Sequence, residues 1–229
     1  MNNGYRYELK FIIDPNKIFH FLEWIKLFGA KEKYGNRTNN SIYFDNSEKS
    51  AIRDNLLGAP ERKKIRIRWY ENSDKIMSSL NLEIKERKGR LNNKINIPLE
   101  KFLPLINEKP IWELNKNIQE FLRDNHPEHT ILQQILLPEL FVKYQRSYFE
   151  IDGSIRFTFD TNIQFSSTIN KLSIRELNPV NYGMSIMEIK FFPEDKNRVA
   201  NLLRHTNLTP KRHSKYLVGS AILKSAMYI

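Results

Sequence analysis

The sequence of 229 residues contains no cysteine. This absence excludes disulfide bonds, thiolate metal sites and cysteine nucleophiles, and it fits a protein of a reducing compartment. The chain also lacks any apolar run of about 18 residues, the length that suggests a transmembrane helix, and its N-terminus has no apolar run of the signal-peptide type. We therefore expect a cytoplasmic protein without a transmembrane segment.

Sequences that mark a boundary between domains are missing as well. No tract rich in Gly and Ser or in Pro divides the chain, its 10 prolines are scattered, and no segment repeats at a fixed period. The hydrophobic content of 40%, with 14 Phe and 10 Tyr, is sufficient for a sizeable core. The sequence therefore predicts a single domain over residues 1–229.

Acidic residues are too few to balance the basic ones. The chain has 26 Asp and Glu against 37 Lys and Arg, which gives a formal net charge of +11. The field of such a protein attracts polyanions, a class that includes nucleic acids, acidic membranes, nucleotides and inorganic phosphates. Charge alone does not choose among these partners.

What the chain does contain is one pattern that recurs from segment to segment. Within residues 79–100, Leu82 and Ile84 alternate with Glu83 and Lys85, so the two sets point to opposite faces of an extended strand. The same alternation occurs in residues 6–13, 63–71, 141–150, 154–162 and 186–192. In these segments the face opposite the apolar residues is dominated by Lys and Arg, which predicts an anion-binding surface.

The chain reads as antiparallel strands with helices at their connections. Helical periodicity occupies residues 15–28, 98–125 and 194–205, and the second of these lies in a helical insertion of about 98–137. Asp14 is expected to cap the first helix, residues 40–46 to form a short strand, and Ser47 to begin a helix through Leu57. Asp152-Gly153 predicts a hairpin turn. Strands that are apolar on one face and cationic on the other form either a sheet over a core or a closed barrel with a polar interior. A cationic interior must hold carboxylates or an anionic ligand, because two like charges ~4 Å apart repel by roughly 4 kcal/mol at an effective dielectric constant of 20.

Eight segments occur in the order of a known family. They are RYELKF, SIYFDN, KIRIRWY, LEIKERKG, VKYQRSYFE, IRFTFD, MEIKFF and HSKYLVG. This order closely resembles the VTC (vacuolar transporter chaperone) polyphosphate polymerase domain, within the triphosphate tunnel metalloenzyme superfamily, from Arg6 to about Lys224. The resemblance implies an α+β fold in which an antiparallel eight-stranded β-barrel forms a tunnel for a triphosphate, with helices packed on the outside. It also implies a divalent cation, Mn²⁺ or Mg²⁺, near the phosphates.

The resemblance further implies which residues form the site. Arg offers a planar fork and Lys a compact charge to phosphate oxygens, while carboxylates are the ligands that Mg²⁺ and Mn²⁺ prefer. The phosphate-binding set is Lys10, Arg66, Arg68, Lys85, Arg87, Lys94, Arg146, Arg156, Lys190, Ser214 and Lys215. The residues expected to act in catalysis are Lys10, Arg66, Arg68, Lys85, Arg156, Lys190 and Glu188. The metal candidates are Glu188, Glu8 and Glu83, of which the last two are equally candidates for salt bridges.

One departure from the superfamily pattern bears on the reaction. Its hydrolases carry Glu-x-Glu-x-Lys on the first strand, whereas this chain has Arg6, Glu8 and Lys10 at those positions. The lost carboxylate weakens the case for a hydrolase, and the pattern resembles the polymerase branch. The resemblance thus implies a transferase that moves the γ-phosphoryl group of ATP onto a polyphosphate chain. The alternatives are an inorganic or nucleoside triphosphatase and a non-catalytic module that binds triphosphate or polyphosphate.

A function from another class, sequence-independent binding of nucleic acid, follows from the charge and the many aromatic residues. Such proteins place aromatic side chains beside basic ones on an exposed face. Here most Phe, Ile and Trp residues alternate away from the basic face, so we expect ATP or another triphosphate and polyphosphate as partners, and no specific nucleic acid. Because the chain starts at the first strand, we also expect neither the inositol-phosphate-sensing SPX domain nor the membrane segments of eukaryotic relatives.

Overall fold

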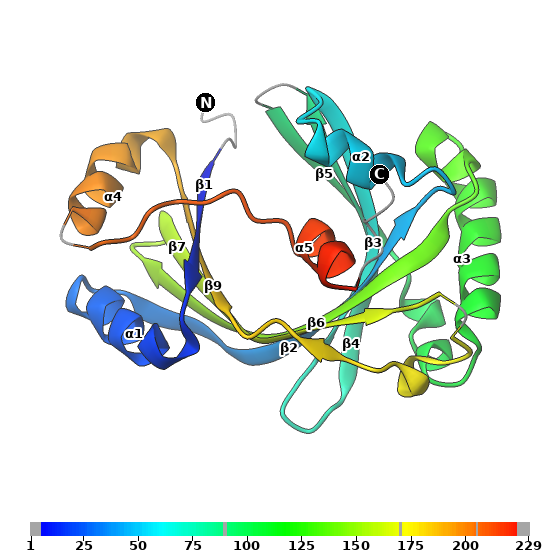
Figure 1. Cartoon of the computed structure of the whole chain (residues 1–229), viewed down its shortest axis with the longest axis horizontal. Coiled ribbons are helices and arrows are strands. Elements are labelled where there is room, and N and C mark those ends of the chain that lie inside the picture. The colour runs from blue at the N-terminus through cyan, green and yellow to red at the C-terminus, as the bar shows by residue number, and fades with distance from the viewer. Residues whose placement is uncertain (1–5, 89–90, 170, 205, 224–229) are drawn as a thin grey trace. The chain divides into compact units, whose positions relative to one another are not determined.

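The computed structural model describes residues 6–88, 91–169, 171–204 and 206–223. These residues form nine strands and five α-helices, joined in places by short 3-10 helices (Figure 1). The strands are β1 (Tyr7–Ile13), β2 (Lys31–Asp45), β3 (Glu61–Glu71), β4 (Met77–Lys88), β5 (Leu91–Pro98), β6 (Leu137–Ile151), β7 (Ile155–Ser167), β8 (Val180–Asn181) and β9 (Ser185–Phe191). The helices are α1 (Ile18–Leu27), α2 (Ser50–Leu56), α3 (Ile111–Asn125), α4 (Lys196–Leu203) and α5 (Lys215–Ile222).

The strands belong to one sheet in the order β1-β9-β7-β6-β2-β3-β4-β5, with β8 paired to β7. The pairs β1/β9, β7/β9, β3/β4 and β4/β5 are antiparallel, which confirms the predicted α+β class with an antiparallel sheet. Because β1 and β5 end this order, the described sheet is not closed by hydrogen bonds. The closed barrel predicted from the sequence is therefore not formed as a hydrogen-bonded ring in the described residues.

The chain divides into two compact units. Unit 1 consists of Met1–Thr38, Tyr144–Ile163 and Asn181–Ser214, and unit 2 of Asn39–Lys143, Gln164–Val180 and Lys215–Ile229. The long strands β2, β6 and β7 contribute residues to both units. The single domain predicted over residues 1–229 stays a prediction.

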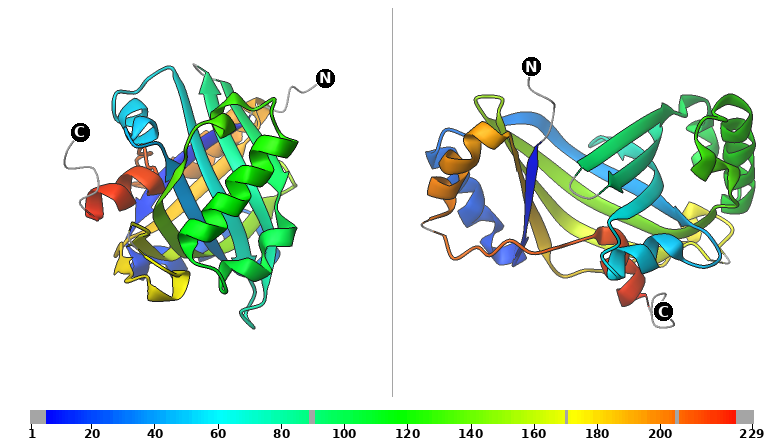
Figure 2. Two further views of the ribbon diagram at one scale, coloured as in Figure 1. Left: turned by 90° about the vertical axis from the view of Figure 1, so that its right-hand side faces the viewer. Right: turned by 90° about the horizontal axis from the view of Figure 1, so that it is seen from above.

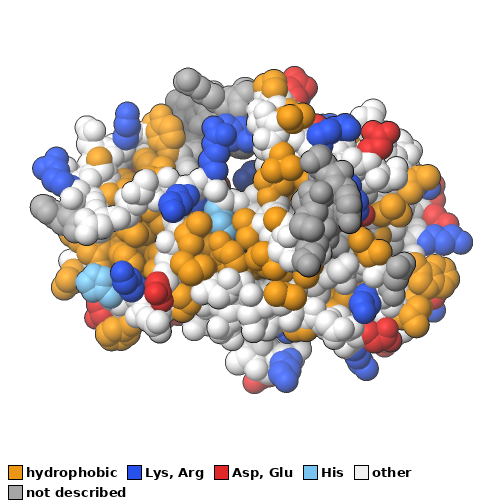
Figure 3. Space-filling model, viewed as in Figure 1, with side chains coloured by type: hydrophobic (Ala, Val, Ile, Leu, Met, Phe, Trp, Pro, Cys, Tyr) orange, Lys and Arg blue, Asp and Glu red, His pale blue; other side chains and the backbone are white. Residues whose placement is uncertain are grey.

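Unit 1 has its core on one face of β1, β7 and β9. Phe11, Phe157 and Ile189 of these strands are buried against α1 and α4 in one hydrophobic cluster, and both helices lie on that side (Figures 1 and 2). The Asp14 side chain accepts a hydrogen bond from the backbone N–H of Asn16 and so caps the turn that leads into α1, as the sequence predicted. Hydrophobic side chains also gather on the outside of α1 (Figure 3), where Phe19 is 73% exposed.

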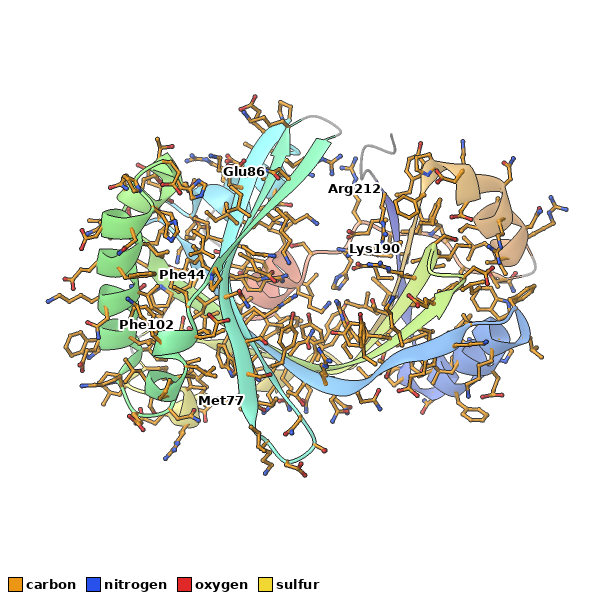
Figure 4. All side chains as sticks on the ribbon, turned by 180° about the vertical axis from the view of Figure 1, so that it is seen from behind. Phe44, Met77, Glu86, Phe102, Lys190 and Arg212 are labelled. Carbon is orange, nitrogen blue, oxygen red and sulfur yellow. The ribbon has the colours of Figure 1, made fainter. Side chains whose placement is uncertain are left out.

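Unit 2 has its core on one face of β3, β4 and β5. Ile65, Ile67 and Leu82 are buried there against Leu114 and Ile118 of α3. The segment between β5 and β6 supplies this cover, since it contains α3 and three 3-10 helices, and Figure 2 shows α3 lying across the strands. Two more members of the cluster, Phe44 and Phe102, lie between the strands and α3 (Figure 4). Thus α1 and α4 in unit 1, and α3 in unit 2, cover the apolar faces of their strands, and the opposite faces carry the charged residues.

Two element boundaries differ from the sequence-based prediction. β2 begins at Lys31, although the pattern predicted only a short strand over residues 40–46, because residues 31–37 are polar and mostly exposed and carry no alternation. α2 begins at Ser50 instead of Ser47, because Lys49 adopts a left-handed conformation with φ of 54°. The side chain of Asp45 accepts hydrogen bonds from the first turn of this helix.

The Asp152-Gly153 turn between β6 and β7 is confirmed. Both residues have positive φ, 49° and 72°, as a tight hairpin turn that matches the twist of its strands requires.

Among the described residues, none of the helices has the length and hydropathy needed to cross a membrane.

Candidate functional site

One face of β3, β4 and β5 in unit 2 is strongly basic. Residues directly opposite each other on antiparallel strands lie on the same face, and Lys85 of β4 lies opposite both Lys64 of β3 and Lys94 of β5. The neighbouring row pairs Arg62 with Arg87. From Arg62 to Arg68, the described rows of this face carry seven basic side chains and one carboxylate: Arg62, Lys64, Arg66, Arg68, Lys85, Arg87, Lys94 and Glu83. We call this set the basic face.

Glu83 is the buried carboxylate of the basic face. Its Oε2 accepts a hydrogen bond from Arg66 Nε at 2.7 Å, and its Oε1 accepts one from Lys94 Nζ at 2.8 Å. Arg68 lies farther away, with NH1 at 3.8 Å from Oε2. Burial would raise the pKa of Glu83, but Arg66, Arg68 and Lys94 outweigh it and hold this pKa well below its usual range. Both oxygens of Glu83 are thus engaged by cations.

Arg66 is also tied to α5 through two tyrosines of unit 2. Its NH1 donates a hydrogen bond to Tyr43 Oη at 2.7 Å. The Tyr43 ring stacks on Tyr216 of α5 with 5.1 Å between centroids and 7° between planes. Tyr216 in turn donates to Asp45 Oδ2 at 2.8 Å. The orientation of Arg66 is therefore fixed both by Glu83 and by a buried polar chain that ends at α2.

A second cluster lies on the polar face of β1, β9 and β7 in unit 1. In it, basic and acidic side chains face each other across β1 and β9. Lys10 lies opposite Glu188, and Glu8 lies opposite Lys190, which is itself opposite Arg156. Lys190 Nζ is 2.7 Å from Glu188 Oε1, and Lys10 Nζ is 2.8 Å from Glu8 Oε1 and 3.7 Å from Glu188 Oε2. Figure 4 places Lys190 on the side of the strands that faces away from α1 and α4. We call these residues the carboxylate cluster.

Glu188 is the most buried carboxylate of this cluster, with 9% of its side chain exposed. Burial would raise its pKa, but Lys190, Lys10 and Arg146 together lower the pKa of Glu188 well below its usual range. The carboxylate is therefore ionised over the whole physiological pH range, which a metal ligand or a salt-bridge partner requires.

Arg146 makes a two-pronged ion pair that the sequence pattern did not reveal. Its Nε and NH2 donate to the two oxygens of Asp160 on β7, the second at 2.7 Å, and Asp160 is almost completely buried. Burial would lower the pKa of Arg146, whereas Asp160 raises it well above its usual value. Arg146 also lines a cavity of about 200 Å³ together with Arg156, Glu188 and Lys190.

The described residues hold no cluster of three or more His, Asp and Glu side chains that could bind a metal ion alone. Of the three predicted metal ligands, Glu8 and Glu188 belong to unit 1, and each forms ion pairs with both Lys10 and Lys190. Glu83 belongs to unit 2. Mg²⁺ is commonly bound by one or two carboxylates together with substrate phosphates. The pair Glu8 and Glu188 fits a divalent cation of that kind.

The remaining predicted residues lie where unit 1 passes into unit 2. Ser214 is the last residue of unit 1, and Lys215 is the first of α5 in unit 2. Just before them, the His213 carbonyl accepts a hydrogen bond from Lys10 Nζ at 3.4 Å, and the His213 ring contacts Tyr182 Oη at 3.2 Å. The segment that precedes α5 is thus held against the carboxylate cluster.

Sequence reasoning missed two residues of the basic face and one residue that orients Arg66. Arg62 and Lys64 continue the alternation of Arg66 and Arg68 on β3, so the same period of two would have found them. Tyr43 could not be found in this way, since its role depends on a contact between β2 and β3.

The sequence model of the VTC domain family matches residues 5–224. The chain belongs to the VTC domain family. This confirms the family predicted from the order of the eight segments.

Comparison with solved structures adds the fold. This VTC domain is similar to the PH1819 protein of Pyrococcus horikoshii OT3, with a TM-score of 0.54, 14% identity, and coverage of 96% of this chain and 99% of that chain. It is also similar to a putative adenylate cyclase of Vibrio parahaemolyticus, with a TM-score of 0.53, 13% identity, and coverage of 93% of this chain and 97% of that chain. A third similar structure is the putative adenylyl cyclase HpAC1 of Hippeastrum, which is described as having a dominant triphosphatase activity. Its TM-score is 0.54 and its identity 13%, with coverage of 95% of this chain and 96% of that chain. At these identities the likeness shows a shared fold. No curated protein sequence matches the chain.

Proposed function

We propose that this VTC domain binds the phosphates of ATP and transfers the γ-phosphoryl group to a polyphosphate chain in the presence of Mn²⁺ or Mg²⁺. The observation that carries the proposal is the basic face, where seven basic side chains meet one carboxylate. An excess of this size is costly without an anionic ligand, and phosphate oxygens match both the fork of Arg and the point charge of Lys.

The extent of the basic face favours a chain of phosphates as one ligand. Its rows run from Arg62 to Arg68 on β3, and six steps of about 3.3 Å give a length of roughly 20 Å. A single triphosphate group is shorter than this strip. The rows of Lys64 and Arg62 would therefore bind further units of a longer polyphosphate, which a polymerase must hold while it adds the next unit.

The carboxylate cluster supplies the groups for the reaction itself. Glu8 and Glu188 would hold the divalent cation, which when bound neutralises charge on the phosphate oxygens. Lys10, Lys190 and Arg156 would bind phosphate groups at this cluster and orient them. The terminal oxygen of the polyphosphate chain then attacks the γ-phosphorus of ATP, a new P–O bond forms, and the bond to the β-phosphate oxygen breaks to release ADP. Phosphoryl transfer depends mainly on positioning and charge stabilisation, so no covalent nucleophile is required.

Arg6 favours transfer over hydrolysis. Its guanidinium lies 4.1 Å from the centre of the Phe192 ring. Burial, and then repulsion from Arg156, lowers the pKa of Arg6, which indicates that Arg156 is near enough to act on it. This end of the carboxylate cluster thus carries a cation where the hydrolases carry a carboxylate. A site with fewer carboxylates is less suited to activating water and better suited to a phosphate acceptor.

A triphosphatase is the second candidate. It is supported by the likeness in fold to HpAC1, which is described as having a dominant triphosphatase activity. One incubation separates the two functions. With ATP and Mn²⁺, a polymerase yields long polyphosphate and an equivalent amount of ADP, whereas a triphosphatase yields orthophosphate and no polymer. Binding of triphosphate without either product would favour a non-catalytic module.

A further inference from the structure

The cavity of about 200 Å³ in unit 1 has walls of two different kinds. One wall is charged and contains Arg146, Arg156, Glu188 and Lys190, and Lys33 is a further charged lining residue. The other is aromatic and contains Tyr34 of β2 and Tyr148 of β6. Phosphate binding explains the first wall. It does not explain the second, because phosphate groups have no planar apolar surface that an aromatic ring could stack on.

The two tyrosines are arranged as an edge-to-face pair. Their ring centroids are 5.6 Å apart and their planes meet at 84°. In such a pair one ring face is covered by the edge of the partner ring, so the pair keeps faces on which a third planar group can stack. Tyr34 is 45% exposed, and the guanidinium of Arg37 lies 5.2 Å from its ring centre. Arg planes and tyrosine rings are both surfaces on which nucleobases stack.

Thr158 gives an independent sign of a ligand in the same cavity. Its Oγ1 is buried and has no hydrogen-bond partner among the described residues, and Thr158 lines the cavity opposite Glu188 on the next strand. A buried hydroxyl without a partner is unfavourable, because it has lost its bonds to water. A ligand with a ring nitrogen or an exocyclic amine would satisfy it.

We propose that this cavity holds the nucleobase of the nucleoside triphosphate, packed against both rings of the Tyr34–Tyr148 pair and hydrogen-bonded by Thr158, with its phosphates towards Arg156 and Lys190. The volume of about 200 Å³ supports this assignment, because sites for whole drug-sized ligands occupy about 300–1,000 Å³ and this one suits a single planar ring system. The inference rests on the proposed function. It adds a site that makes ATP a better ligand than tripolyphosphate.

Binding of ATP and of tripolyphosphate, each measured by calorimetry with Mg²⁺, tests the inference. Tyr34→Ala and Tyr148→Ala should each weaken ATP binding about tenfold, as expected for the loss of one stacking partner. Tripolyphosphate should bind these variants as it binds the wild type, since it has no base. Tyr148→Phe keeps the ring and should retain the affinity for ATP. Thr158→Val removes the hydroxyl without changing the side-chain shape and should weaken ATP binding only.

Phe19→Ala is the matched control, because it removes an exposed ring of α1 outside the cavity. It should leave both affinities unchanged. Equal losses for ATP and tripolyphosphate in the tyrosine variants would overturn the nucleobase site, and so would unchanged ATP affinity in variants that melt like the wild type. Failure of the proposed function looks different, because the wild type incubated with ATP and Mn²⁺ would then form no polyphosphate, while a loss of affinity confined to ATP in the tyrosine variants would still be measurable.

Discussion

Glu188 combines burial with a strongly favoured negative charge, and its neighbours Lys10, Lys190 and Arg146 are all cations. If Glu188 ligates the metal ion, Glu188→Gln removes a negative charge from a site that must bind phosphates. Metal-free tripolyphosphate should then bind as well as before or more tightly, whereas turnover of ATP with Mn²⁺ should collapse. Calorimetry without metal and a polyphosphate assay with metal measure the two effects.

The control for this variant is Glu86→Gln. Glu86 also pairs with a lysine, Lys63, at 2.8 Å, but it lies on the opposite face of β4 from Glu83, because the two residues are three positions apart on one strand. Its replacement should leave both binding and turnover unchanged. If Glu188→Gln lowers only the melting temperature of the ligand-free protein and metal-dependent turnover survives, Glu188 is a salt-bridge partner and no metal ligand.

Replacement of Arg66 tests how much a single guanidinium of the basic face contributes to phosphate binding. Its fork is shared between Glu83 and Tyr43, so it is already oriented when a phosphate arrives. Arg66→Ala should weaken tripolyphosphate binding by roughly 1.5 to 3 kcal/mol, the contribution of a charge-assisted hydrogen bond. Arg66→Lys should recover only part of this loss, because a point charge cannot replace the fork.

Arg198 provides the comparison for Arg66. It lies on α4 and pairs with the exposed Asp152 at 2.6 Å. Arg198→Ala removes the same charge from the protein, and tripolyphosphate affinity should stay within about twofold of the wild type at 0.15 M salt, where exposed charges beyond ~8 Å are largely screened. A loss as large as that of Arg66→Ala would mean that net charge, and not the basic face, determines binding.

At the scale of elements, the pairing of β6 with β7 contains a buried ion pair. Arg146 and Asp160 share two hydrogen bonds, and Asp160 is 1% exposed. Asp160→Asn leaves the Arg146 charge buried without its counter-charge and should lower the free energy of unfolding by roughly 3 to 5 kcal/mol. Urea denaturation measures this loss.

Asp152→Asn is the exposed counterpart, because Asp152 pairs with Arg198 at the surface with 72% of its side chain exposed. It should cost less than about 1 kcal/mol. If the two variants lose equal amounts of stability, the Arg146 guanidinium is solvated in the native state, and its assignment as a phosphate ligand gains weight over its structural role.

The same elements show what the sequence could and could not predict. The alternation on β3, β4, β7 and β9 is local, so the basic and apolar faces and the role of α1 as a cover were predictable. Register is not local, because it depends on which strands meet. The contacts of Glu83 with Arg66 and of Arg146 with Asp160 therefore came only from the structure. The first half of β2 has neither an apolar face nor a turn signal to mark it, and its strand conformation depends on its neighbours in the sheet.

At the scale of the whole molecule, the net charge of +11 would attract any polyanion, nucleic acid included. The distribution of aromatic residues argues against a nucleic-acid surface on the basic face. Trp69 of β3 is 1% exposed and packs into the core with Phe141, so it offers no stacking platform beside Arg66 or Arg68. The charge would therefore concentrate anions at the protein, and under the proposed function the geometry of the basic face selects phosphates among them.

The stability of the whole molecule should depend on pH through two of its buried carboxylates, Glu83 and Glu188. In the folded state the pKa values of Glu83 and Glu188 are lowered from the ordinary value of 4.5, against the effect of burial, by the surrounding Lys and Arg residues. The unfolded chain therefore binds more protons below about pH 4.5, so the stabilisation is complete above that pH and is lost as the pH falls further. We expect the free energy of unfolding to be nearly constant from about pH 8 to pH 5.5 and to fall steeply below about pH 4.5.

Glu83→Gln should be less stable than the wild type at pH 7, because Arg66 and Lys94 lose their counter-charge. Its stability should fall less steeply in acid, since it has one lowered pKa fewer, and the two curves should converge at low pH. Glu120→Gln is the control, because Glu120 is an exposed residue of α3 with its carboxylate 3.9 Å from Lys116, and its replacement should change the free energy of unfolding by less than about 0.5 kcal/mol. Urea denaturation from pH 3 to 8 supplies the curves. A constant gap between Glu83→Gln and the wild type down to pH 3 would show that Glu83 contributes through packing and not through its charge.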